Sequence, residues 1–190
     1  MLCEYAFIFK KDSLVLNGFY ENYMPQHCGG MEKKMGKKIN YKIGDIFIVP
    51  LEENLKGAGR ILKINQATVF IELYHMKPVK EISDFNFEEA TKNKPLVMAW
   101  CYDDGLVKGG WKVFDNKPVD TDIEMPYFWH SDAGDGKYYI RKGTEDSFRT
   151  FGERIEIKKE DINKYDSGGI GNEISKTNMY TIRLKEAGLL

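Results

Sequence analysis

The chain has 190 residues, 42% hydrophobic and 30% charged, so it is long enough to bury a core and does not have the composition of a disordered chain. Its formal net charge of -1 gives no chain-wide basic excess of the kind found in proteins that bind nucleic acids or membrane surfaces. The charge is uneven, however, because residues 103–137 carry eight acidic side chains against four basic ones.

The cysteines and the N-terminal residues bear on the cellular compartment in which the protein works. Cys3, Cys28 and Cys101 form no paired spacing, which argues against a disulfide framework and favours a reducing environment. No apolar run approaches the roughly 20 residues of a membrane span. The first lysines follow the apolar N-terminal residues, which is the reverse of a secretory signal. We therefore expect a cytoplasmic protein.

The first 40 residues differ in pattern from the rest. Ala6–Phe9 and Leu14–Leu16 flank a polar turn and predict a short hairpin. Asn17–Lys38 is rich in Gly, Lys and Met, has no helix or strand period, and predicts a loop or linker. We expect residues 1–40 to be an N-terminal extension, a hairpin plus linker packed on the core, and residues 41–190 to form the main β domain.

Three apolar runs predict antiparallel strands at the start of the main domain. Ile46–Val49 stands between Gly-Asp and Pro, which is typical of a short strand buried on both faces. Gly57–Leu62 carries two glycines, as a bent strand or a close backbone approach requires. Ala67–Tyr74 alternates, so that every second residue lies on one apolar face. We expect these strands to begin a small barrel or curved sheet.

The middle of the chain adds a helix and two strands. Ser83-Asp84 can cap a brief helix over Phe85–Lys92, which would end before a proline. Leu96–Tyr102 is apolar or aromatic throughout, which predicts a strand with two buried faces and a place at the centre of the sheet. The glycines and charges of residues 103–110 predict a loop, and Trp111–Phe114 continues as a strand.

The last third is less regular. Met125–His130 and Tyr138–Arg141 predict strands on either side of an acidic, glycine-rich turn. Arg154–Lys158 alternates as an exposed strand, and Lys159–Tyr165 predicts a helical turn. Tyr180–Leu184 fits either a final strand or a short terminal helix. The whole pattern predicts a mostly β (α+β) fold, with an antiparallel curved sheet or small barrel-like core and one or two short helices.

Candidate catalytic and metal-binding groups are few. His27-Cys28 is an adjacent pair, but neighbouring residues point apart, which does not suit a nucleophile and its base. Zinc needs about four ligands, and the three histidines and three cysteines are scattered. A hydrolase would need a deep pocket with perturbed titratable groups around His75 or His130. We expect no catalytic residue, no metal and no cofactor.

Three loop features have plain structural explanations. Asp132–Gly136 lacks the alternating ligands and closing glutamate of a calcium loop and fits a hairpin turn better. Gly168–Gly171 lacks the lysine that follows a phosphate loop and fits a flexible connection. Trp129 beside His130 could stack a base, but no basic stripe surrounds them.

Three short sequence motifs, which serve as cues to a family, lie within residues 43–139. They are the GD, strand and PL start at Gly44–Leu51, the GxGR strand at Gly57–Arg60, and a tryptophan followed by a turn and a proline at Trp111–Pro118. In these cues the chain resembles the Immunity protein 26 family of bacterial polymorphic toxin systems. The resemblance implies a mostly β protein, not an enzyme, that binds and neutralises a toxin made by a neighbouring gene.

The resemblance also implies a partner, a cognate toxin domain, with a nuclease as one option and no membrane or nucleic acid. An acidic surface suits the basic cleft of a toxin with an anionic substrate and speeds encounter. We therefore expect the toxin to contact the acidic segment, with Trp129 as an aromatic anchor, through Asp103, Asp104, Asp120, Asp122, Glu124, Trp129, Asp132 and Asp135. The alternative is a small β-barrel adaptor that binds nucleic acid or a peptide.

Overall fold

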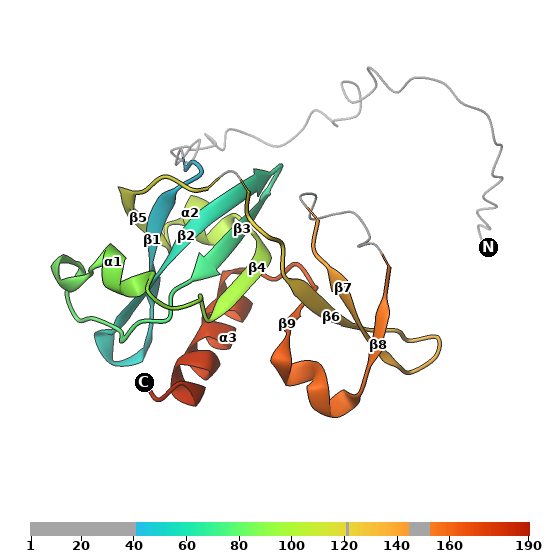
Figure 1. Cartoon of the computed structure of the whole chain (residues 1–190). Helices are drawn as coiled ribbons and strands as arrows, with labels where there is room; N and C mark the ends of the chain where they lie inside the picture. The colour runs from blue at the N-terminus through green and yellow to red at the C-terminus, as the bar shows by residue number, and fades with distance from the viewer. Residues whose placement is uncertain (1–40, 121, 145–152) are drawn as a thin grey trace, which may run out of the picture. The chain divides into compact units, whose positions relative to one another are not determined.

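The computed structural model describes residues 41–120, 122–144 and 153–190, which form two β-sheets and several helices (Figure 1). The hairpin and linker predicted within residues 1–40 lie outside these ranges. Both sheets are open, and the described strands close no barrel. The predicted mostly β (α+β) class is confirmed, with open sheets in place of a barrel.

The first sheet has five antiparallel strands in the order β4-β3-β2-β1-β5. They are β1 (Asp45–Pro50), β2 (Lys56–Asn65), β3 (Thr68–Leu73), β4 (Val97–Tyr102) and β5 (Lys112–Asn116). Irregular register between β1 and β5 and between β2 and β3 marks bulges, which increase local bend and twist. Each of the five coincides with a run predicted as a strand.

The two faces of this sheet bury different cores. On one face, apolar residues of β1, β3 and β4 pack against the C-terminal helix α3 (Glu173–Glu186). On the other face, Phe70 lies 5.3 Å from the Trp100 ring and 6.5 Å from the Phe128 ring of the second sheet, centroid to centroid. Strict alternation along β3 produces this division, because successive side chains of a strand point to opposite faces.

Strand β4 lies at the edge of the first sheet, so the prediction that Leu96–Tyr102 forms its centre is wrong. Its outer edge is covered instead by a later part of the chain. The Met98 amide donates to Asp166 Oδ2 at 3.1 Å, and the Tyr102 amide donates to the Gly171 carbonyl at 2.9 Å. This cover and the two cores explain why an edge strand has the apolar sequence of a central one.

Residues 103–110 contain a short helix, α2 (Asp104–Lys108), where the sequence predicts a loop. Leu106 is 1% exposed and packs in the core that contains α3. Gly109 follows the helix in the left-handed conformation, with a φ of 80°. A glycine in this conformation is a common helix stop, so the residue that suggested a loop is the C-terminal cap of a helix.

The second sheet has the strand order β8-β7-β6-β9. Its strands are β6 (Tyr127–Ser131), β7 (Tyr138–Lys142), β8 (Ile155–Ile157) and β9 (Asp166–Ser167). The predicted hairpin, exposed strand and helical turn are confirmed as β6–β7, β8 and the 3-10 helix η3 (Lys159–Lys164). Strand β9 is the exception to the antiparallel pattern, since it pairs parallel with β6.

The other short helices are η1 (Glu52–Asn54), η2 (Ile82–Asp84) and α1 (Phe87–Ala90). Helix α1 begins later than predicted because Asn86, and not Ser83 or Asp84, caps it by accepting a hydrogen bond from the Glu89 amide at 3.2 Å. The helix also ends at Ala90, before the predicted end at Lys92. None of the helices in the described part of the chain is long and apolar enough to cross a membrane.

Helix α3 decides between the two readings of Tyr180–Leu184. Lys176, Tyr180 and Leu184 are its buried residues, at a spacing of four, whereas Ile182 is 57% exposed. Residues four apart share one face of a helix. The helical alternative is therefore correct, and its buried face lies against the first sheet.

Gly57 of β2 lets α3 approach the sheet closely. A β-carbon at this position would overlap the Tyr180 ring. The Tyr180 side chain is fully buried, and its hydroxyl donates to the Tyr74 carbonyl at 2.7 Å. Burial raises the pKa of Tyr180 far above its ordinary value, so the hydroxyl remains a donor.

We expect Gly57→Ala to lower the free energy of unfolding by about 1 to 3 kcal/mol, because the added methyl group forces the Tyr180 ring out of its contacts. Urea unfolding followed by circular dichroism measures the change. Gly169→Ala is the matched control, because a β-carbon there meets only Ser167 Oγ at 3.6 Å. Equal stability of the two variants would contradict the close packing of α3 on Gly57.

Candidate partner-binding surface

The first of the three motif cues joins β1 to β5. Gly44 has a φ of 88°, which glycine adopts readily. The Asp45 carboxylate is buried, and it accepts hydrogen bonds from the Lys42 amide and from the Asn116 side chain, each at 2.8 Å. The Gly-Asp pair therefore shapes the entry to β1 and fixes its neighbour strand.

The arginine of the GxGR cue also has a structural role. Arg60 Nε lies 2.8 Å from Glu72 Oε1 on the adjacent strand, and both side chains are mostly buried. The Arg60 guanidinium also donates to the Pro118 carbonyl at 2.9 Å and covers the Phe87 ring at 5.3 Å. Burial raises the pKa of Glu72, while the charge of Arg60 opposes that rise.

The tryptophan cue completes the pattern. Trp111 is 1% exposed and stacks on Phe47 of β1, with ring centroids 4.8 Å apart. Its indole nitrogen donates to Thr177 Oγ1 of α3 at 3.3 Å. All three cues thus have structural roles in the scaffold.

The eight residues predicted to bind a toxin fall into separate groups. Asp103 and Asp104, at the end of β4, are engaged within the protein. The Tyr41 hydroxyl donates to Asp103 Oδ2 at 2.5 Å, and burial together with this bond raises the pKa of Tyr41. Asp104 Oδ2 lies 3.6 Å from the Lys108 ammonium. These carboxylates mainly organise α2 and its surroundings.

The second group lies on the β5–β6 connection, residues 117–126. Asp120, Asp122 and Glu124 are exposed there. Within the described residues, Asp120 and Asp122 have no hydrogen bond or ion pair, and Glu124 has only an exposed contact of 3.4 Å with the Lys142 ammonium. Exposed pairs of this kind contribute little to stability. These three carboxylates are the ones most available to an outside partner.

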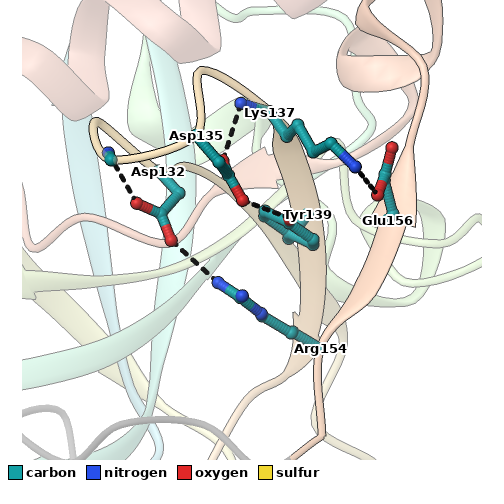
Figure 2. A network of polar contacts seen from close by, with 7 residues as sticks. Asp132, Asp135, Lys137, Tyr139, Arg154 and Glu156 are labelled. Atoms are coloured by element: carbon teal, nitrogen blue, oxygen red, sulfur yellow. Dashed lines mark hydrogen bonds and ion pairs between the residues drawn. The ribbon is translucent and has the colours of Figure 1, made fainter.

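The third group belongs to a polar network around the β6–β7 turn, shown in Figure 2. We call it the hairpin network, and its members are Asp132, Asp135, Lys137, Tyr139, Arg154 and Glu156. Asp132 Oδ2 accepts from Arg154 at 2.8 Å, and Asp135 Oδ2 accepts from the Tyr139 hydroxyl at 2.6 Å. Lys137 reaches Glu156 of β8 at 2.7 Å. Each acidic side chain in the network has a partner of its own.

These bonds shift the titration of Asp135 and Tyr139. The Tyr139 hydroxyl, and then the Lys137 amide, donate hydrogen bonds that hold the pKa of the Asp135 carboxyl below its usual range. The same bond to Asp135 raises the pKa of Tyr139. The Arg154 guanidinium lies over the Tyr139 ring, 4.3 Å from its centroid. The acidic side chains of the turn are therefore engaged within the protein and do not form a free acidic patch.

Trp129 lies on the opposite face of the second sheet from Tyr139. It stands directly across from Ile140, and its ring is 6.3 Å from the Tyr138 ring. Tyr127 and Ile155 are 41% and 49% exposed, and alternation places their side chains on this same face. Trp129 is itself half-buried. We call Tyr127, Trp129 and Ile155 the aromatic face, which is an accessible apolar surface. It lies beside the β5–β6 connection, because Lys142 pairs with Tyr127 across the strands and contacts Glu124 of that connection.

A cleft of about 940 Å³ is lined by His75, the first of the two histidines around which a hydrolase would need its pocket. Asp166 lies in the same cleft, and burial raises its pKa. Its oxygens are already used, because Oδ2 accepts from the Met98 amide and Oδ1 lies 3.5 Å from Arg183. The described residues that line this cleft include no serine, threonine or cysteine. Asp166 of β9 therefore has a structural role, since it links β9 to β4 and to α3.

The remaining candidate groups are also accounted for. Cys101 is fully buried, and burial raises its pKa to about 12, so it is a thiol rather than a thiolate nucleophile. His27 and Cys28 lie outside the described residues. Among the residues that the structure describes, no group of three or more His, Cys, Asp or Glu side chains could hold a metal ion.

The family comparison agrees with these cues. The profile of the family described as Immunity protein 26 matches residues 42–140, which is just over half of the chain. The protein belongs to the Immunity protein 26 family. No curated protein and no solved structure matches the chain. The match spans the whole first sheet and most of the β6–β7 hairpin, and it ends before β8 and α3.

Sequence reasoning missed the cationic and aromatic partners of the acidic turn, which are Lys137, Tyr139 and Arg154. The available signal was the predicted strands themselves, because Arg154 opens the alternating run Arg154–Lys158 and Tyr139 lies within the predicted strand Tyr138–Arg141. The pairing of β7 with β8 cannot be read from alternation alone, so their contact was not predictable.

The Tyr139–Asp135 hydrogen bond predicts a pH-dependent contribution to stability. A carboxyl whose folded pKa is lowered stabilises the fold above its unfolded pKa, and that contribution is lost as the pH falls through the folded pKa. We expect Tyr139→Phe to lower the Tm at pH 7, with the deficit shrinking below about pH 4. Thermal unfolding of the full chain from pH 7 to pH 3 measures this.

Tyr138→Phe is the control for this variant, since it removes a neighbouring hydroxyl for which the described residues offer no hydrogen bond and keeps the ring contact with Trp129. Its Tm should follow the unmodified protein at every pH. A Tyr139→Phe deficit that is the same at pH 7 and pH 3 would show that Asp135 does not depend on this hydroxyl.

Proposed function

We propose that this protein is a bacterial immunity protein that binds and neutralises a cognate polymorphic toxin encoded by a neighbouring gene. Membership of the Immunity protein 26 family over residues 42–140 carries the proposal. The role is one of binding and not of catalysis, and the toxin is met in the cytoplasm. The buried thiol of Cys101 and the cleft around His75, which lacks a serine, threonine or cysteine, support a binding role.

The β5–β6 connection is the acidic part of the proposed toxin-binding surface. Asp120, Asp122 and Glu124 are exposed, and their charges are the least compensated of the eight candidates. A basic toxin surface, such as that of a nuclease, would be attracted to them and would associate faster. Asp132 and Asp135 contribute less in this proposal, because binding through them would compete with Arg154 and Tyr139.

The aromatic face is the apolar part of the same surface. Binding energy in protein interfaces concentrates on a few aromatic residues surrounded by polar ones. Trp129, with Tyr127 and Ile155 beside it, meets this description, and the contact between Glu124 and Lys142 makes the aromatic face continuous with the acidic connection. The toxin would therefore be attracted by the carboxylates and held by the aromatic side chains.

The test is a binding titration against the toxin domain encoded next to this gene. We expect the combined variant Asp120→Lys, Asp122→Lys and Glu124→Lys to bind about 10- to 100-fold more weakly, mostly through slower association, with a weaker dependence on salt. Trp129→Ala should lose a similar factor or more through faster dissociation. Surface plasmon resonance at two salt concentrations separates the two effects.

A matched control reverses three exposed carboxylates elsewhere, Glu52, Glu53 and Glu160, and so changes the net charge by the same amount. It should keep the affinity of the unmodified protein. If both triple variants bind alike, the acidic connection is not part of the interface. If the unmodified protein does not bind or inhibit the neighbouring toxin, the immunity function itself is wrong.

A further inference from the structure

A small pocket lies on the face of the second sheet opposite to the aromatic face. In the β6–β7 register, His130 pairs with Tyr139 and Phe128 with Arg141, so these four side chains share one face. Arg154 joins them, since its guanidinium covers the Tyr139 ring. The pocket measures about 260 Å³, and Arg141, Arg154 and His130 all line it.

The two arginines of this pocket differ in their partners. Arg154 donates a hydrogen bond to Asp132 at 2.8 Å, and its guanidinium lies over the Tyr139 ring. Arg141 has no hydrogen bond or ion pair within the described residues, and its Nε atom is buried without an acceptor. A buried N–H of a guanidinium is normally paired, because an unmade hydrogen bond to a charged group costs free energy.

The charge of the pocket is therefore positive. Arg154 and Asp132 offset one another, so that among the described residues the Arg141 charge has no counterion. Burial, and then the nearby Arg141 charge, lower the pKa of His130, so its imidazole is neutral at pH 7 and can donate or accept a hydrogen bond. The only carboxylate lining the pocket within the described residues, Asp132, faces Arg154, and Asp135 accepts from Tyr139.

Size and chemistry limit what could bind. Pockets for drug-sized ligands and cofactors measure roughly 300 to 1,000 Å³, so this one suits a smaller group. A guanidinium presents parallel N–H donors that match the oxygens of a carboxylate or a phosphate. An anion of this kind would supply the acceptor that Arg141 Nε lacks.

We propose that the Arg141 pocket is a binding site for an oxyanion, a carboxylate or phosphate group held by the Arg141 guanidinium beside His130 and Arg154. The oxyanion is either an acidic side chain of the partner toxin, which rests on the proposed immunity function, or a free phosphate ion. The site is distinct from the acidic connection and from the aromatic face, and it has the opposite charge.

The first experiment needs no toxin and uses the full chain. The Nε–Hε resonances of the arginines are followed by NMR while sodium phosphate, and separately sodium acetate, is added at constant ionic strength with sodium chloride as the reference. We expect a saturable shift of the Arg141 resonance with at least one of these anions, with a Kd below ~10 mM. We also expect phosphate or acetate to raise the Tm by an amount that follows this occupancy.

Two variants of Arg141 test whether this residue binds the anion, measured by the rise in Tm that the anion causes. Arg141→Gln should weaken the effect of the anion at least about tenfold, and Arg141→Lys, which keeps the charge but not the fork, should weaken it less. Lys142→Gln is the control, because it removes the adjacent positive charge on the opposite face of the strand. Absence of a saturable shift in the unmodified protein, or equal responses of Arg141→Gln and Lys142→Gln, would overturn the proposal.

Competition then identifies the source of the oxyanion. If toxin binding weakens with phosphate more than with chloride at equal ionic strength, and Arg141→Gln removes that difference, the pocket takes a toxin carboxylate. If phosphate binds through Arg141 without affecting toxin binding, the pocket takes a free oxyanion. If the chain binds no toxin at all, the immunity function fails while the phosphate titration still decides the pocket.

Discussion

Tyr180 occupies the space beside Gly57 that a side chain would otherwise fill, and much of the structure depends on this contact. The helix that carries Tyr180 closes the larger core of the first sheet. The Tyr180 hydroxyl donates to the Tyr74 carbonyl, which lies just after β3. Trp111 adds a second link from β1 to the same helix through Phe47 and Thr177. The sheet and α3 therefore form one packing unit, although the family profile ends before α3.

Local pattern predicted most strands because each is a short apolar or alternating run bounded by turn residues. It failed where the answer depended on distant residues. The apolar sequence of β4 reports two buried faces but not an edge position, since Asp166 and Gly171 come some 70 residues later and cover that edge. The parallel pairing of β9 with β6 is equally non-local. The surface candidates were limited in the same way, because composition shows which residues are acidic but not which of them are already paired.

The distribution of charge follows from this difference between composition and pairing. Asp132 and Asp135 have nearby cations or hydroxyl donors, whereas the β5–β6 connection leaves its carboxylates in solvent. On the second sheet, successive residues of β6 and β7 point to opposite faces, so that one face carries Tyr127 and Trp129 and the other carries His130 and Arg141. A single two-stranded hairpin can thus present two surfaces of different chemistry while its backbone hydrogen bonds remain the same.

The cover on the edge of β4 protects the first sheet from pairing with other molecules. Until residues 166–171 arrive, β4 is an apolar strand with an open row of amides and carbonyls, which is the arrangement that recruits strands from other molecules. The contacts that cover this edge join residues about 70 positions apart, so closing the intervening loop costs entropy. The segment around residues 166–171 therefore protects the first sheet, and a chain without it would expose an apolar strand edge to pairing with other molecules.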